Sequence, residues 1–113
     1  MSINNIVKNA LDDIAPMQAS DFEPEDNSVE EYIVLNYFTL PDDFTDDEPG
    51  HETISAQVHY YCPSGFNSRI KRKNIKKRLQ AAGFTYPSAV DASDRDGQHH
   101  IFECMIAVEV GGE

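Results

Sequence analysis

The sequence is poor in cysteine, in long apolar runs and in the motifs of common active sites. Cys62 and Cys104 are too few for a disulfide scaffold and have no Cys-x-x-Cys spacing, so we expect them to be reduced, as in a cytoplasm. No apolar run approaches the roughly 20 residues of a membrane-spanning helix, and residues 1–13 lack the basic and apolar regions of a secretion signal. Phosphate-binding loops, GxGxxG and GxSxG sequences are also missing. We therefore expect a protein without catalytic residues or cofactor that is neither secreted nor inserted in a membrane.

Length and composition are those of one small globular domain. The chain has 113 residues, of which 40% are hydrophobic and 26% are charged. A chain of this size has room for one modest core. We therefore expect a single domain over residues 1–113.

Basic residues are few, and they are concentrated in one block. Nine Lys and Arg stand against twenty Asp and Glu, which gives a net charge of −11. Residues 1–52 contain fourteen acids and one base, and residues 91–113 contain six acids and one base. Residues 53–90 contain no acid and the seven remaining bases: Arg69, Lys71, Arg72, Lys73, Lys76, Lys77 and Arg78. The net charge argues against a general nucleic-acid binder, whereas the bipolar distribution is typical of proteins that bind one another.

The N-terminal segment predicts an amphipathic helix. Its apolar residues recur with helical spacing from Ile3 to Ile14, Ser2 can cap it, and Pro16 ends it. An acidic connection follows at about residues 16–30.

Three later segments predict the strands of an antiparallel sheet. Residues 32–40 are apolar on both faces apart from Asn36, which suits a central strand. Residues 53–61 and 99–110 alternate between apolar and polar positions, as half-buried strands do. The first two strands would form a hairpin whose tip is an exposed acidic loop at about residues 41–52.

A second helix is predicted at about residues 66–82. Gly83 should end it in a left-handed conformation, with Phe84 folded back onto Leu79. A polar loop with a turn at residues 94–97 would lead to the last strand. The expected apolar stripe of this second helix is Phe66, Ile70, Ile75, Leu79 and Ala82. The order α-β-β-α-β predicts an α+β fold, with an antiparallel sheet of three to four strands and two helices packed on one face.

Metal binding is the less favoured interpretation of two residue sets. The acidic loop contains the oxygen ligands that Ca²⁺ and Mg²⁺ prefer, but its spacing fits no loop that we can derive. A zinc site would need four ligands at one point, and alternation separates the available set. That set is His59, Cys62, His99, His100 and Cys104. We expect no metal site.

The basic helix and the acidic loop are the candidate interaction surfaces. We favour a charge-complementary protein interface in which the helix of one subunit lies near acidic segments of the next. A DNA-contacting helix and a plain solvated helix face are the alternatives. The candidate interface residues are Arg69, Arg72, Lys73, Lys76 and Lys77 in the helix and Asp42, Asp43, Phe44, Asp46 and Asp47 in the loop.

Four segments, with the acidic loop between the first two, form a pattern over about residues 30–106. They are Tyr32–Phe38 (YIVLNYF), Ser55–Pro63 (SAQVHYYCP), Asn74–Phe84 (NIKKRLQAAGF) and His99–Glu103 (HHIFE). This pattern resembles the tail-terminator, or tail-completion, family of long-tailed siphophages and prophages. The basic helix departs from the family pattern, so the resemblance does not fix its role.

The resemblance implies a structural protein of virion assembly. Such a subunit would form a ring, expected to be hexameric, that caps the phage tail tube, stops its polymerisation and takes part in head–tail joining. Its partners would be further copies of the chain, the tail tube protein and the head–tail connector or completion protein, with DNA only passing through the lumen. It would be assembled in the bacterial cytoplasm and lie at the head-proximal end of the tail. The alternatives are a DNA-binding or regulatory protein that uses residues 66–82, and a head-completion protein at the head–tail joint.

Overall fold

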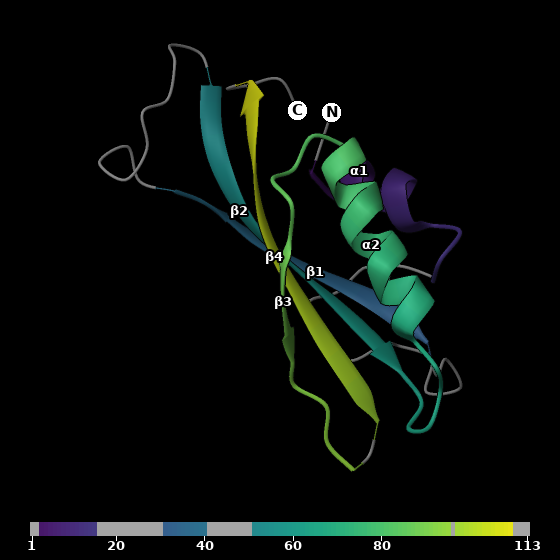
Figure 1. Ribbon diagram of the computed structural model, residues 1–113. Coiled ribbons are helices and arrows are strands. Elements are labelled where there is room, and N and C mark those ends of the chain that lie inside the picture. Colours follow the sequence, from purple (N-terminus) through teal and green to yellow (C-terminus); the bar gives the residue numbers. More distant parts are fainter. Residues whose placement is uncertain (1–2, 16–30, 41–50, 96, 110–113) are drawn as a thin grey trace.

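The computed structural model describes residues 3–15, 31–40, 51–95 and 97–109. The strands form one antiparallel sheet in the order β1-β2-β4-β3. Both helices lie on the same side of this sheet (Figure 1). In chain order the elements are α1 (Ile3–Leu11), β1 (Tyr32–Thr39), β2 (His51–Cys62), α2 (Arg69–Ala81), β3 (Ser88–Asp91) and β4 (Gln98–Glu109). The predicted α+β class, with both helices on one face, is confirmed.

The core lies between the helices and one face of the sheet. Alternate residues of β2 and β4 point to this face, because successive side chains of a strand point to opposite sides. The helices bury Ile3, Val7 and Leu11 of α1 and Ile75 and Leu79 of α2. The buried strand residues in this core are Ile33, Leu35, Ile54, Ala56, Val58, Tyr60, Cys62, Phe102, Cys104 and Ile106.

The prediction that residues 32–40 form a central strand is wrong. β1 lies at one edge of the sheet and pairs only with β2 among the described strands. Its apolar character on both faces has another cause: Ile33 faces the core, and Val34 is also buried although it points to the opposite face. A strand can therefore bury side chains on both of its faces although it pairs with another strand along one edge alone.

The expected polar loop after α2 contains a short strand. Ser88 pairs with Glu103 and Asp91 pairs with His100, so β3 forms the second edge of the sheet. All four residues of β3 are exposed, and an exposed strand leaves no alternating pattern in the sequence. The predicted turn is present, with the Asp94 N–H donating to the Gly97 carbonyl at 3.0 Å.

Helix α2 begins at Arg69, three residues later than predicted, and its apolar stripe is narrower. Phe66 lies outside the helix and Ile70 is 71% exposed. Five residues correspond to about 140° around a helix, so Ile70 points away from the face that buries Ile75. The C-terminal end agrees with the prediction: Gly83 has φ of +110°, and the Phe84 N–H donates to the Leu79 carbonyl at 3.1 Å. Neither described helix has the length and apolar character needed to cross a membrane.

Candidate functional site

Two of the seven bases of α2 attach the helix to the N-terminal part of the chain. Lys71 Nζ lies 2.7 and 2.9 Å from the two carboxylate oxygens of Glu31, which also accepts a short hydrogen bond from the Tyr60 hydroxyl. Arg78 forms a two-point contact with Asp13, at 2.5 and 3.0 Å, and this hydrogen bonding lowers the pKa of the Asp13 carboxyl. These two bases therefore stabilise the fold of the chain.

Arg72 and Lys76, both predicted interface residues, are partly engaged in contacts within the chain. Arg72 Nε donates to Ser68 Oγ at 2.9 Å, and the Ser68 hydroxyl donates to Gln98 Oε1 at 2.7 Å. Lys76 Nζ lies 5.9 Å from the centroid of the Tyr86 ring, within cation–π range. Both residues flank the outward surface of α2 without lying at its centre.

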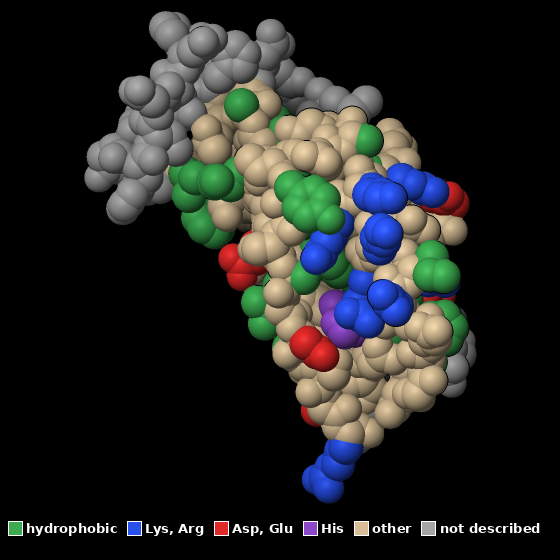
Figure 2. Space-filling model, in the orientation of Figure 1, with side chains coloured by type: hydrophobic (Ala, Val, Ile, Leu, Met, Phe, Trp, Pro, Cys, Tyr) green, Lys and Arg blue, Asp and Glu red, His purple; other side chains and the backbone are tan. Residues whose placement is uncertain are grey.

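Arg69, Lys73 and Lys77, which we call the outward stripe, form the centre of that surface. They are spaced by four residues, which places them in one row along the helix. All three are exposed, and none forms an ion pair with another residue that the structure describes. Figure 2 shows Lys and Arg side chains gathered over this side of the molecule. Of the predicted basic site, the outward stripe is the part available to a partner.

The acidic half of the predicted interface is not placed. Asp42, Asp43, Phe44, Asp46 and Asp47 lie outside the described residues. Next to that segment, the Thr39 hydroxyl and Glu52 Oε2 on the adjacent strands β1 and β2 lie 3.4 Å apart. The structure therefore brings together the basic residues of the prediction and leaves their acidic counterpart untested.

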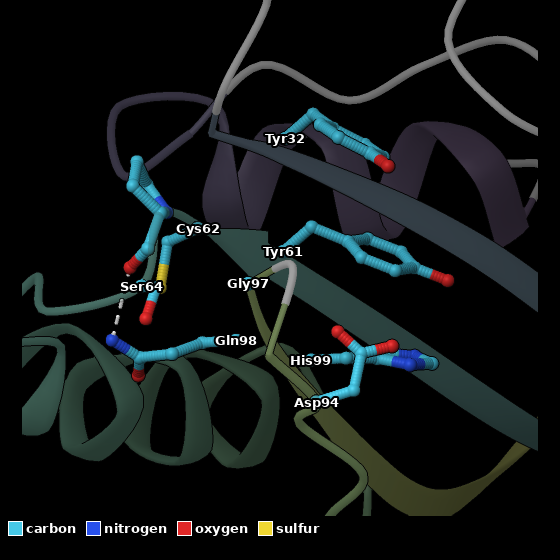
Figure 3. A pocket seen from close by; sticks show the side chains of 9 residues that line it. Tyr32, Tyr61, Cys62, Ser64, Asp94, Gly97, Gln98 and His99 are labelled. Carbon is cyan, nitrogen blue, oxygen red and sulfur yellow. Dashed lines mark hydrogen bonds between the residues drawn. The ribbon is translucent and has the colours of Figure 1, made fainter.

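A row of stacked rings lies on the sheet face opposite the helices. Tyr32, Tyr61 and His99, which we call the aromatic row, occupy directly paired positions on β1, β2 and β4. The ring centroids of Tyr32 and Tyr61 are 4.6 Å apart and those of Tyr61 and His99 are 4.2 Å apart, with interplanar angles of 14° and 16°. Figure 3 shows the three rings side by side. His59 extends the cluster, because its Nδ1 lies 2.8 Å from Nε2 of His99.

The aromatic row forms one wall of a pocket of about 400 Å³. Its lining also includes Ser64, Asp94 and Gln98, and no Lys or Arg is among the described lining residues. The Gln98 side chain is held in place, since Nε2 donates to the Phe66 carbonyl at 2.5 Å and to the Pro63 carbonyl at 3.2 Å.

Burial disfavours the charged forms of Tyr61 and His99 in this pocket and of His59 beside it. Burial lowers the pKa of His59 and of His99, although the Asp94 carboxylate acts in the opposite direction on His99. Burial also raises the pKa of the Tyr61 hydroxyl. The pocket thus combines uncharged π faces with one carboxylate, which suits a cation and disfavours a phosphate.

The aromatic row is not among the sites predicted from the sequence. The predicted alternation of residues 53–61 and 99–110 places His59, Tyr61 and His99 on the face opposite their apolar neighbours, and the structure agrees. The row itself depends on the register that pairs Tyr32 with Tyr61 and Tyr61 with His99. An aromatic or histidine residue at the same end of each of three predicted strands is the signal that could have revealed it.

The residues weighed as zinc ligands are divided between the two faces of the sheet. His100 and Cys104 are buried toward the helices, whereas His59 and His99 lie on the other face. Within the part of the chain that the structure describes, no three His, Cys, Asp or Glu residues are grouped so that they could hold a metal ion. Comparison with models of known protein families gives no match, and comparison with curated protein sequences gives none either.

Proposed function

We propose that the chain is a structural subunit that assembles head to tail into a ring and acts as a tail terminator in a long-tailed phage or prophage. The single observation that carries this proposal is the outward stripe: Arg69, Lys73 and Lys77 point away from their own subunit on a chain with a net charge of −11. A surface of this kind is complementary to acidic regions of other copies.

A closed ring needs two different surfaces on each subunit, one for each neighbour. The helix side supplies a basic surface. The opposite sheet face carries exposed apolar side chains, with Phe38 57% exposed and Met105 42% exposed, together with the exposed carboxylate of Glu103. These two unlike sides support a head-to-tail contact rather than a symmetric pairing of one surface with itself.

The buried nucleophilic groups support a role without catalysis. Burial raises the pKa of the Cys104 thiol to about 11 and also raises the pKa of the Cys62 thiol, so both stay protonated near neutral pH. The Ser68 hydroxyl is held between Gln98 and Arg72. Neither arrangement presents an activated nucleophile to solvent.

In this role the partners are further copies of the chain, the tail tube protein and the head–tail connector. The ring, expected to be a hexamer, would cap the tube because its second face does not match another tube ring. Its location would be the head-proximal end of the tail in the virion.

Light scattering coupled to size-exclusion chromatography tests the proposal. The wild-type chain should give a species several times its 12.7 kDa mass, with ring-shaped particles in negative-stain images. Assembly should weaken as salt rises from about 0.05 to 0.5 M, because screening shortens the reach of the charges. The triple variant Lys73→Glu, Lys76→Glu, Lys77→Glu should be a folded monomer.

The matched control is Lys8→Glu, which reverses an exposed lysine on α1 and should leave assembly unchanged. Rings with wild-type salt dependence in the triple variant would show that the helix is only a solvated surface. A wild-type monomer that shifts duplex DNA would instead favour the DNA-binding alternative.

A further inference from the structure

The proposed function does not account for the aromatic row or for the pocket beside it. Resting on that function, we propose that this pocket receives the guanidinium group of Arg69 from the neighbouring copy in the ring. The outward stripe of one subunit would then end in the aromatic pocket of the next.

The pocket has the chemistry of a site for a planar cation. Aromatic faces attract cations through their quadrupole, and the attraction increases when the cation is shielded from water. Tyr61 and His99 supply neutral stacked rings, and Asp94 supplies a carboxylate at the same pocket. A guanidinium can stack against a ring and hydrogen-bond a carboxylate at the same time.

Among the bases of α2, Arg69 is the one that suits this pocket. The guanidinium of Arg78 is held by Asp13, and that of Arg72 donates to Ser68. Lys73 and Lys77 carry compact ammonium groups that lack a plane for stacking. Arg69 is the only arginine of the outward stripe, and its side chain is exposed.

Arg69 and the pocket are placed as a head-to-tail contact requires. Both adjoin the connection from β2 to α2: Pro63 and Ser64 line the pocket, and Arg69 begins the helix a few residues later. The aromatic row lies on the sheet face opposite the helices, because its residues alternate with the buried core residues of β1, β2 and β4, whereas Arg69 is the first residue of α2 on the other face. Arg69 and the aromatic row are therefore at the same end of the strands but on opposite faces of the sheet. Copies related by rotation about an axis along the strands would bring them together.

Substitutions at position 69 should separate stacking from charge. Arg69→Ala should raise the protein concentration needed for half-assembly by about tenfold per contact, within the range of a shielded cation–π pair. Arg69→Lys keeps the charge but loses the planar stack. The logarithm of its half-assembly concentration should therefore lie closer to that of Arg69→Ala than to that of the wild type. Lys8→Ala, at an exposed position on the other helix, should have no effect.

A cross-linking experiment tests the contact directly. Arg69→Cys and Ser64→Cys variants of the full chain are treated with a short bismaleimide, alone and as a mixture. The native Cys62 and Cys104 are buried, so the added exposed thiols react first. The expected result is a covalent dimer in the mixture that neither variant gives alone.

The outcomes distinguish this inference from the proposed function. A dimer from Arg69→Cys alone would indicate a symmetric contact and overturn the inference. Rings that form normally in Arg69→Ala, without a cross-link between positions 69 and 64, would overturn the inference and leave the proposed function standing. A wild-type chain that is monomeric at every concentration would overturn both.

Discussion

The helix-covered face and the open face of the sheet are built from alternating residues of the same strands, yet they differ in chemistry. Along β4, Phe102 is fully buried against the helices, whereas Met105 on the other face is 42% exposed. At the end of β2, Tyr60 belongs to the core and its neighbour Tyr61 stacks in the aromatic row. One strand can therefore contribute to the core on one face and leave side chains accessible on the other, because successive side chains point to opposite faces. Substitutions on the two faces should consequently give different kinds of defect.

The largest difference should come from truncating one residue on each face. Phe102→Ala removes a fully buried ring and should lower the free energy of unfolding by about 3–5 kcal/mol. Met105→Ala should cost less than about 1 kcal/mol, since its side chain already contacts water. Urea unfolding followed by circular dichroism measures both values. Equal losses would contradict the division of the sheet into a core face and an open face.

A smaller effect is expected where α2 ends against the covered face. Gly83→Val should lower the free energy of unfolding by about 1–2 kcal/mol, because a β-branched residue is strained at positive φ. A Cβ at position 83 would also lie 3.4 Å from Cδ1 of Ile106. Gly65→Val should share the strain of positive φ, since its φ is +85°, but its Cβ would meet no atom within 4 Å, so the difference between the two variants measures the contact with Ile106. An unchanged melting temperature for Gly83→Val would show that the left-handed end is not needed.

Acid should weaken the domain from both faces. Burial lowers the pKa of His59 and His99 on the open face and of His100 on the covered face, so the unfolded chain binds more protons than the folded chain below about pH 6.5. The free energy of unfolding should fall as the pH decreases from about 7.5 to 5.5. The lowered pKa values of Asp13 and Asp91 act only below about pH 4, outside this window.

Histidine substitutions divide this pH dependence between the faces. Urea unfolding of a His59→Gln, His99→Gln double variant should show a smaller dependence than wild type, with the remainder due to His100. A wild-type free energy of unfolding that does not change over this pH range would contradict the burial of these rings.

The smallest difference should appear between two cysteines on the covered face. Cys62 has hydrogen-bonding neighbours in Tyr60 and Ser68, so a serine hydroxyl at position 62 would find partners. Burial alone raises the pKa of the Cys104 thiol, with no hydrogen bond contributing to the shift. Cys104→Ser should therefore lower the free energy of unfolding by about 1 kcal/mol more than Cys62→Ser does. The double variant should still assemble in cells. A folded double variant that fails to assemble would give the thiols a role beyond packing.

Local patterns predicted the elements that local chemistry determines. The alternation at 53–61 predicted the core face of β2, and the spacing of Leu79, Gly83 and Phe84 predicted the end of α2. The position of β1 at the sheet edge was not predicted, because the hydrophobic pattern of a strand does not show which strands pair with it. The strand β3 was not predicted, because all of its residues are exposed and give no alternating hydrophobic pattern. The aromatic row was missed for a related reason: its residues are up to 67 positions apart, as from Tyr32 to His99, and only the strand register brings them together.

The pairing of β2 with β4 has a mechanical consequence. These two central strands have twelve residues each and pair over their whole length, which corresponds to about 40 Å of continuous ladder. A pull directed along the strands loads all of these hydrogen bonds together, whereas a pull across them breaks the bonds one pair at a time. The domain should therefore resist force along one axis and yield along the perpendicular one, so the direction of an applied load decides whether it stays folded.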